Sequence, residues 1–417
     1  MRIESANAVD LGSPAGQLRA RAVRLGPDAP PAALVAWCAD FDVDPYVEMF
    51  YFPSDTLKLA VVTAEGEVLW TRDLGKGVVP GMWFCPIHAF DLDGDGVSEI
   101  WLVSNVNEDH PLSLRGYRLE RLDAATGETT GQWPWPCGNS NQALGPQFRN
   151  FILGGHVRGE PALVTAQGTY GDMFIQGWRP DMAPRWEHVV RAEDPGARGS
   201  HMAPVVDLND DGVDELLWGE RCIELDGGRE LFCCDRETYR GHSDIIWPFR
   251  NPETGRYVIF TARESDGEVS PRVALFDDSG ERIWGAVDRG HMDTGWVACR
   301  DDGRRVAMAI RIGHKTCGPD GRHHQDRKEF VFDALTGERL ELPFSVYQTI
   351  PVTTGKGHDV LVRGIPGGNG DVLDWRGEVI ANVPGTVAMA QGYVRRPGDV
   401  LLTYEPSGTI RFWNVGG

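Results

Sequence analysis

One short pattern recurs along the chain: a strand-like run, a turn that contains glycine, and a second strand-like run. It occurs in TAEGEVLW, AATGETTGQW, LDGGRELF, DDSGERIW, ALTGERLEL and DWRGEVIANV. The copies are roughly 40 to 60 residues apart, which is the range of blade lengths in β-propellers. Each copy is typical of a hairpin within a blade. The repeat therefore predicts an all-β fold in which small sheets surround a central axis.

An apolar run precedes most of these hairpins, and we expect it to form the inner strand of each blade. The runs are AALVAWC, FCPIHAFDL, FRNFILGGHV, HMAPVVDL, HSDIIWPF, HMDTGWVAC, VYQTIPVTT and VAMAQGYV. Eight runs favour eight blades, although the less regular first and last units leave seven open. The unit from about Gly385 has three strands, and an N-terminal strand within QLRARAVRL would complete it and close the ring. We expect one propeller domain over residues 1–417, with two stacked β-sandwiches as the rival fold.

Composition narrows the classes of partner. The 51 Gly and 27 Pro fit a chain of short strands and many turns. A net charge of -20 argues against binding of nucleic acid or an anionic membrane through bulk charge. The N-terminal residues have no apolar run typical of a signal peptide, so the expected location is cytoplasmic, with the eight Cys reduced. Nothing in the sequence indicates an oligomeric state.

Three acidic segments, DLDGDGVSE, DLNDDGVDE and DFDVDPYVE, place oxygen side chains at the same offsets. Alternate oxygen ligands followed by a later carboxylate suit Ca²⁺, and a backbone carbonyl near Val97 or Val213 would add a ligand. Solvated acidic turns without metal are the alternative, and Pro45 weakens the third segment because it replaces a turn Gly. We expect all three loops on one face as structural calcium sites. The side-chain ligands would be Asp91, Asp93, Asp95 and Glu99; Asp207, Asn209, Asp211 and Glu215; and Asp40, Asp42, Asp44 and Glu48.

The motif Arg-Gly-His-x-Asp appears at His242 and again at His291, and a looser version surrounds His201. All three His begin inner strands, so they should lie on the rim away from the acidic loops. Packed turn residues are the alternative interpretation. Four further residues reach the same rim, either before an inner strand or after a second strand. The candidate site is therefore His201, His242, His291, Arg149, Tyr170, Arg311 and His314.

This set of side chains fits proton abstraction beside a carboxylate. Arg149 or Arg311 would pair with the carboxylate of a uronic acid, which makes its C5 proton more acidic. His201 or His242 would take that proton, and Tyr170 would protonate the leaving oxygen. His291 would orient the sugar or join a metal site, because three His can also hold a transition metal. Glu220 and Glu264 are weaker candidates for the paired carboxylates of a glycoside hydrolase.

The segment SHMAPVVDLNDDGVDELLWGERCIELDGGRELF, followed by RGHSDIIWPFRNPETG, resembles the propeller-type polysaccharide lyases. It is most similar to the eight-bladed, calcium-binding rhamnogalacturonan lyases, and ulvan lyases and rhamnosyl-glucuronate lyases look similar. His242 and Asp244 match the family's G-H-G-D motif, with Ser243 in place of the second Gly. The resemblance covers about Gly199 to Gly255. It implies β-elimination at a uronate–rhamnose linkage and a uronate-containing oligosaccharide as partner.

Two other functions remain open from the sequence. A propeller that binds sugars or a protein without catalysis would use the same rim residues but form no new product. A glycoside hydrolase would release reducing ends without forming an unsaturated uronate.

Overall fold

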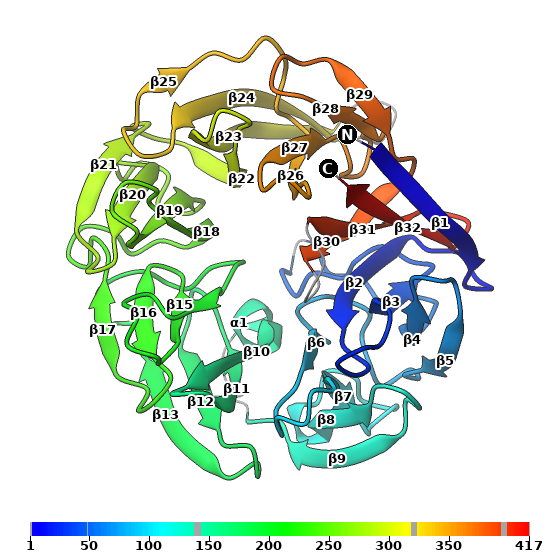
Figure 1. The fold of residues 1–417 in the computed structure, drawn as a ribbon. Coiled ribbons are helices and arrows are strands. Elements are labelled where there is room, and N and C mark those ends of the chain that lie inside the picture. Colours follow the sequence, from blue (N-terminus) through cyan, green and yellow to red (C-terminus); the bar gives the residue numbers. More distant parts are fainter. Residues whose placement is uncertain (1, 48, 137–142, 318–322, 393–397, 417) are drawn as a thin grey trace.

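The fold is an all-β ring of eight four-stranded sheets around a central channel (Figure 1). The computed structural model describes residues 2–47, 49–136, 143–317, 323–392 and 398–416. Each sheet is a meander of antiparallel strands, and neighbouring sheets follow one another along the chain. This architecture confirms the predicted eight-bladed β-propeller.

The strands are given from the channel outward. Blade 1 consists of β2 (Gln17–Val23), β3 (Ala32–Cys38), β4 (Lys58–Thr63) and β5 (Val68–Asp73). Blade 2 consists of β6 (Ile87–Phe90), β7 (Glu99–Asn105), β8 (Tyr117–Asp123) and β9 (Thr129–Pro134). Blade 3 consists of β10 (Asn150–Val157), β11 (Glu160–Gln167), β12 (Met173–Trp178) and β13 (Pro184–Val190). Blade 4 consists of β14 (Val205–Val206), β15 (Glu215–Trp218), β16 (Arg221–Glu224) and β17 (Glu230–Cys233).

Blade 5 consists of β18 (Ser243–Arg250), β19 (Tyr257–Arg263), β20 (Val273–Asp277) and β21 (Arg282–Ala286). Blade 6 consists of β22 (His291–Cys299), β23 (Arg305–Cys317), β24 (His323–Asp333) and β25 (Arg339–Leu340). Blade 7 consists of β26 (Ile350–Thr353), β27 (Asp359–Val362), β28 (Asp371–Leu373) and β29 (Val379–Asn382). Blade 8 consists of β30 (Thr386–Gly392), β31 (Asp399–Tyr404), β32 (Thr409–Gly416) and β1 (Arg2–Asp10). A short helix, α1 (Leu144–Phe148), precedes blade 3, and a 3-10 turn (Leu114–Gly116) precedes β8. No helix in these described residues is long and apolar enough to cross a membrane.

The hairpin repeat is explained by packing between blades. Trp186 on the outer strand of blade 3 donates from Nε1 to the carbonyl of Leu225 in blade 4 at 2.6 Å. A Cβ on Gly228, in the outer hairpin turn of blade 4, would lie 2.5 Å from the nearest atom of that indole ring, which is closer than real Cβ contacts come. Trp284 and Gly337 repeat this relation between blades 5 and 6. The turn glycine is therefore required because an aromatic ring of the preceding blade occupies the space of its side chain.

The ring closes through the first strand, but not through the segment expected. β1 pairs with β32 along the outer edge of blade 8, whereas QLRARAV forms β2, the inner strand of blade 1. AALVAWC is consequently β3, a second strand rather than an inner one, and all seven of its residues are buried. Apolar cores fill the spaces between blades, as where Leu34 and Leu59 of blade 1 pack with Leu102 of blade 2.

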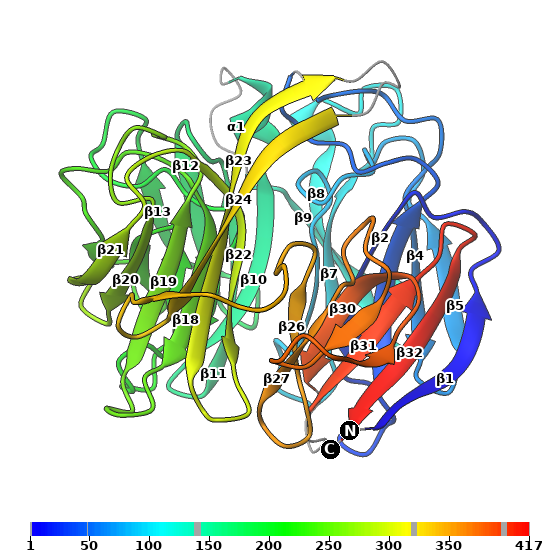
Figure 2. The same cartoon turned by 90° about the horizontal axis from the view of Figure 1, so that it is seen from above.

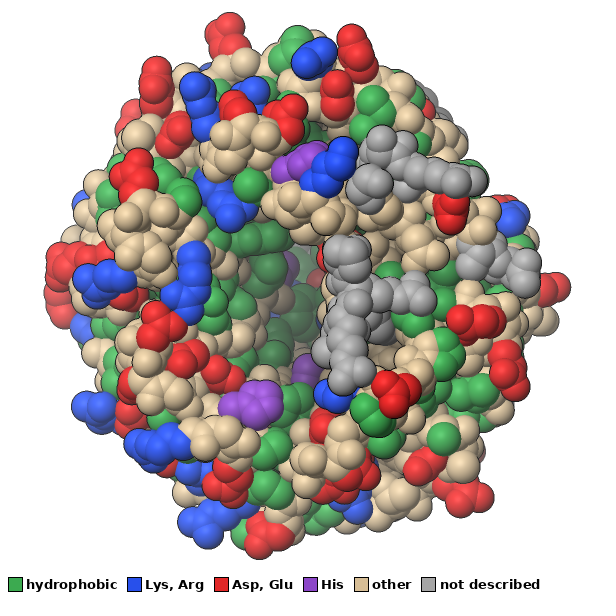
Figure 3. All heavy atoms as spheres, viewed as in Figure 1, with side chains coloured by type: hydrophobic (Ala, Val, Ile, Leu, Met, Phe, Trp, Pro, Cys, Tyr) green, Lys and Arg blue, Asp and Glu red, His purple; other side chains and the backbone are tan. Residues whose placement is uncertain are grey.

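The two faces of the ring carry different connections. We call the site face the one with the turns between second and third strands and the links between blades. The opposite face carries the turns between inner and second strands. In Figure 2, α1 and the long β23–β24 hairpin rise at the upper edge, which is the site face. Figure 3 looks onto the opposite face, where acidic side chains are spread around the rim and the channel opens at the centre.

Candidate functional site

Two acidic loops, 91–99 and 207–215, lie on the opposite face and adopt nearly the same conformation. In each, the first Asp accepts hydrogen bonds from backbone N–H groups three to five residues later. The closing Glu accepts a 2.8 Å hydrogen bond from the Leu that follows the first Asp. The N–H groups of Val97 and Val213 donate to Asp95 and Asp211, each at 2.8 Å. The matched spacing in the sequence thus corresponds to matched geometry.

The carboxylates of the first loop converge. Oxygen atoms of Asp91, Asp93 and Glu99 lie within 4.8 Å of one another. Burial, followed by the charges of neighbouring Asp residues, raises the pKa of Glu99 to about 7. The same causes raise the pKa of Glu215 in the second loop to about 7. Carboxylates crowded in this way resist ionisation unless a cation balances them, so the donor sets fit a hard divalent cation.

The third acidic loop differs from the expectation. It connects β3 to β4, the second and third strands of blade 1, so it lies on the site face. Its carboxylates point to separate partners: Asp40 accepts from the N–H of Ser54 at 2.7 Å, and Asp42 from that of Met82 at 3.0 Å. Asp44 pairs with Arg149 at 3.2 Å. Glu48 lies outside the described residues. The loop does not gather its acids as a calcium loop would, and Asp44 belongs instead to the surroundings of the His cluster.

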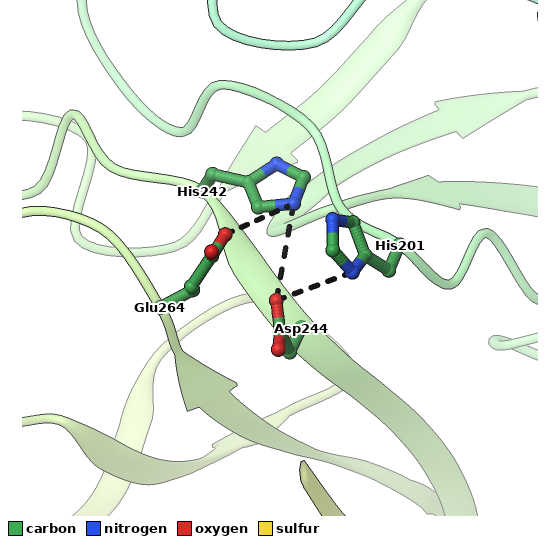
Figure 4. A group of neighbouring side chains, drawn as sticks. All are labelled: His201, His242, Asp244 and Glu264. Atoms are coloured by element: carbon green, nitrogen blue, oxygen red, sulfur yellow. Dashed lines mark ion pairs between the residues drawn. The ribbon is translucent and has the colours of Figure 1, made fainter. Parts of the chain in front are cut away.

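The His cluster consists of His201, His242, Asp244 and Glu264, which meet on the site face (Figure 4). One nitrogen or oxygen of each side chain lies within 4.8 Å of the others. Asp244 is the centre: its Oδ1 lies 3.4 Å from His201 Nδ1 and 4.0 Å from His242 Nε2. His242 Nε2 also lies 3.6 Å from Glu264. These residues come from blade 5 and from the link that enters blade 4.

Charge in this cluster is poorly balanced. Burial, followed by the nearby Glu264, raises the pKa of Asp244 well above its usual range. Burial, followed by His201 and Arg149, lowers the pKa of His242 well below its usual range. Both ring nitrogens of His242 and the Oδ1 of Asp244 are buried without a hydrogen-bond partner among the described residues. Such atoms are costly to bury, so a ligand that supplied partners for them would stabilise the cluster.

Arg149 fixes the tautomer of His201. Its Nη1 lies 2.9 Å from His201 Nε2, and a guanidinium can only donate, so Nε2 accepts and the ring proton sits on Nδ1, facing Asp244. Burial, followed by the Arg149 charge, lowers the pKa of His201 to about 3. Trp83 supports both residues, with its ring 5.2 Å from the His201 ring and 5.1 Å from the guanidinium. His201 is therefore a neutral, oriented imidazole.

Tyr170 covers the cluster from the solvent side. Its hydroxyl donates to Glu264 Oε2 at 2.7 Å, and its ring lies 4.6 Å from the His242 ring. Burial, followed by Glu264, raises the pKa of Tyr170 above its usual value, so the hydroxyl stays protonated. Its backbone φ is 68°, a conformation that non-glycine residues adopt at a cost and that clusters at functional sites. With 39% of the residue exposed, Tyr170 can reach a bound molecule.

The other expected site residues lie in different places. His291 approaches the cluster, with Nε2 3.4 Å from Glu264 and 3.6 Å from Asp293. Arg311 contacts none of the cluster residues in the described structure; it lines a neighbouring hollow between blades 5 and 6. His314 lies on the extended part of β23, and its side chain is not among the described ones. Five of the seven candidates therefore lie in or beside the His cluster, whereas Arg311 lines a separate hollow.

Three further residues take part that the sequence did not place at the centre. Asp244 was expected only to orient a neighbour, and Glu264 only as a weak hydrolase candidate. Trp83 comes from the link into blade 2, and no motif marks it. Glu264 directly follows Arg263, the last residue of the second strand β19, and this position on the site face is the signal that could have identified it.

A buried ion pair lies directly beneath the cluster. Arg263 donates from Nε and Nη2 to both oxygens of Glu220, at 2.8 and 2.6 Å, and neither side chain is exposed. Ser243 also donates to Glu220 at 3.0 Å. Because Ser243 lies between His242 and Asp244, and Arg263 precedes Glu264, this pair fixes the backbone that carries three of the four cluster residues.

No protein-family model matches the chain. A rhamnogalacturonan exolyase, YesX of Bacillus subtilis (strain 168), is 26% identical over 286 residues, or 60% of this chain and 44% of the relative. A rhamnogalacturonan endolyase of the same organism, YesW, is 24% identical over 219 residues, or 44% of this chain and 34% of the relative. The matches therefore span less than half the length of these curated relatives.

Solved structures show the same fold. The exotype rhamnogalacturonan lyase YesX superimposes with a TM-score of 0.71 at 17% identity, over 99% of this chain and 76% of the other. A Bacillus licheniformis rhamnogalacturonan lyase of family PL11 gives a TM-score of 0.77 at 16% identity, over 100% of this chain and 76% of the other. The resemblance that the His242 motif predicts is therefore confirmed: in sequence and in fold, this chain is similar to the propeller-type rhamnogalacturonan lyases.

Proposed function

We propose that this chain is a polysaccharide lyase that cleaves a uronate–rhamnose linkage by β-elimination. The observation that carries the proposal is the series of contacts Arg149–His201–Asp244 beside Tyr170. It places a cation, an oriented imidazole and a protonated hydroxyl around one exposed point. The similarity to rhamnogalacturonan lyases supports the same reaction class.

The first step in this proposal is the exchange of partners at Arg149. A substrate carboxylate would compete for the guanidinium that now donates to His201 Nε2, and bidentate pairing favours the carboxylate. That exchange would free the lone pair of Nε2. It would also balance the Arg149 charge, which is one cause of the low pKa of His201, and so make the imidazole a stronger base.

The proton steps then follow from the contacts already present. His201 Nε2 takes the C5 proton, and Asp244, whose Oδ1 lies 3.4 Å from Nδ1, orients the ring. Tyr170 donates its hydroxyl proton to the leaving glycosidic oxygen. The double bond forms between C4 and C5 as the C4–O bond breaks. His242 is fully buried and cannot reach a sugar, so it positions the cluster rather than acting as the base.

A divalent cation would fit the same cluster. His201, His242, Asp244 and Glu264 would hold it, and the unpaired buried atoms of His242 and Asp244 support this arrangement. Mixed imidazole and carboxylate ligands suit a transition metal. When bound, the cation would neutralise the substrate carboxylate. His201 would serve as a ligand only after Arg149 turned to the substrate carboxylate, which would leave Nε2 free to carry the ring proton, and Tyr170 would remain as the exposed group that moves the proton.

We further propose structural calcium at the loops 91–99 and 207–215. The converging oxygens of the first loop and the matched hydrogen bonds of the second support it. Both loops connect an inner strand to its neighbour on the opposite face, so the ions would stabilise two blades without touching the substrate.

The geometry argues against a glycoside hydrolase. Such enzymes hold two carboxyl groups about 5 Å or more apart on either side of the scissile bond. Here Asp244 is buried, and one of its oxygens lies within 4.8 Å of an oxygen of Glu264, so no sugar can lie between the two carboxyl groups.

The test is to incubate the protein with rhamnogalacturonan oligosaccharides and follow the ultraviolet absorbance of the 4,5-unsaturated uronate. A matched substrate whose uronates have been reduced to neutral sugars should give no product, because its C5 proton is not acidic. Reducing ends without absorbance would identify a hydrolase, and neither signal would identify a binding protein. Metal analysis of the purified protein, with Tyr170→Phe and His201→Ala assayed in parallel, separates the two versions of the mechanism. A bound transition metal together with loss of that metal in His201→Ala supports the cation version.

A further inference from the structure

A second hollow on the site face lies beside the candidate site, between blades 5 and 6. It has a volume of about 630 Å³ and is bounded by the links around β22 and the extended β23–β24 hairpin. Figure 2 shows this hairpin rising above the upper edge of the ring. Six charged side chains line the hollow: Arg289, Arg311, Arg327, Lys328, Glu268 and Asp326. Cations thus outnumber acids in a chain whose net charge is -20.

The four cations keep their capacity to bind an anion. Across the described structure, no ion pair joins any of them to a carboxylate. Aromatic rings support three of them instead: the Arg327 guanidinium lies 3.6 Å from the Tyr347 ring centre, and Arg311 and Lys328 lie 5.8 and 5.4 Å from that of Phe330. A ring face holds a cation without supplying a negative charge. These side chains are therefore held in place while their charges stay available.

The backbone is adapted to bring Arg311 into this hollow. Gly290 has a φ of 111°, and a Cβ at this position would lie 2.3 Å from Arg311 Cδ. Any other residue would displace the arginine. The middle residue of the second Arg-Gly-His motif is therefore required by the cation beside it, and the first residue, Arg289, lines the same hollow.

The hollow adjoins the candidate site through neighbouring residues. Gly290 directly precedes His291, whose Nε2 lies 3.4 Å from Glu264 of the His cluster. Arg311 pairs with Met292 across β22 and β23, one residue beyond His291. A sugar chain that places one uronate at Arg149 and passes His291 would therefore bring a later residue over the hollow.

We infer that this hollow is a second carboxylate-binding subsite, which holds another uronate residue of the same oligosaccharide. The inference rests on the proposed function for the identity of the ligand. A uronate fits because its carboxylate can pair with a guanidinium in a bidentate manner, while the remaining lining accommodates a sugar ring. The subsite would select substrates in which uronate recurs along the chain.

The test compares binding of two oligosaccharides by calorimetry: a rhamnose–uronate disaccharide with one carboxylate and a tetrasaccharide with two. The variants are Arg289→Gln and Lys328→Gln, alone and combined. The matched control is Arg304→Gln, which removes an exposed arginine of the same blade from the turn between β22 and β23 on the opposite face. Loss of a charged hydrogen bond should weaken tetrasaccharide binding about tenfold per variant, with little change for the disaccharide. Adding inorganic sulfate tests whether the subsite accepts any oxyanion.

The possible results separate the subsite from the proposed lyase function. Selective loss of tetrasaccharide binding in the two hollow variants, but not in Arg304→Gln, supports the subsite. Equal binding of the tetrasaccharide by all variants overturns it, and turnover measured on the same samples shows whether the lyase function survives. If binding depends on the hollow but no unsaturated product forms, the subsite stands and the proposed function fails. Competition by sulfate at the same concentration as the sugar would overturn specificity for uronate.

Discussion

The buried pair Glu220–Arg263 allows a quantitative prediction that links stability to the site. Glu220→Ala leaves the Arg263 guanidinium in the core with one carboxylate, Asp235, at 2.8 Å in place of two. It also removes the acceptor of Ser243. Breaking a buried ion pair from one side costs about 3–5 kcal/mol, and the remaining Asp235 places the expected loss near the lower end, at about 3 kcal/mol. The folded-to-unfolded ratio would fall by more than about 100-fold.

The assay is denaturant unfolding, in which a lower midpoint at unchanged slope reports the loss of stability. Glu220→Gln should cost less, because it keeps the shape and one acceptor. The combined replacement Glu220→Leu with Arg263→Met should cost far less than the two single changes together, since it leaves no buried charge uncompensated. Two results would refute the reasoning. One is a free energy of unfolding for Glu220→Ala within about 1 kcal/mol of wild type. The other is a cost in the double variant equal to the sum of the two single costs. Turnover per folded molecule should also fall in Glu220→Ala, because the pair fixes the backbone on either side of the cluster.

Three further predictions concern the site, the acidic loops and pH. His242→Ala should lower lyase turnover on the order of 100-fold by misplacing the cluster, whereas His88→Ala, which removes a buried imidazole from another blade, should not. Excess calcium should raise the thermal midpoint over that in chelator, because each occupied loop adds about 2.7 kcal/mol of stability at 100 times its dissociation constant, and Asp91→Asn with Asp207→Asn should abolish the difference. Burial lowers the pKa of His88 to about 4, so the unfolded chain, whose His titrates near 6.5, binds the proton first. The contribution of His88 to the free energy of unfolding should therefore be fully present above pH 6.5 and should fall by about 3 kcal/mol as pH approaches 4. His88→Gln should reduce this pH dependence of the melting temperature.

The overall fold could be predicted because its repeating unit is local. The hairpin turn and its glycine appear in the sequence of each blade, so their number and spacing were readable. The error in blade 1 has a physical cause. β2 lines the channel and alternates charged with apolar residues, as Arg19 and Arg21 show, whereas the neighbouring β3 is fully buried. Choosing the most apolar run as the inner strand therefore selected the wrong one and moved the Asp40 loop to the wrong face.

The candidate site could be predicted only for residues at equivalent positions of the repeated blades. His201, His242 and His291 occupy equivalent positions in consecutive blades, so one rule placed all three. Arg311 followed the same rule but was misplaced. Its strand runs past the end of blade 6 and packs against Gly290, a contact that depends on tertiary structure. Trp83 reaches the site from another blade, and no local pattern indicates that contact.

The closure of the ring also determines how the molecule responds to mechanical force. β1 and β32 run antiparallel, with Arg2 opposite Gly416, so both chain ends lie at the same corner of blade 8. Tension between the ends would load the hydrogen bonds of this pair one after another, rather than all together, because they lie perpendicular to the strands. The ring should therefore unzip from its closure at low force, and the seven remaining blades should unravel in order from that point. Single-molecule pulling from an internal pair of attachment points, across two strands of one blade, would meet greater resistance.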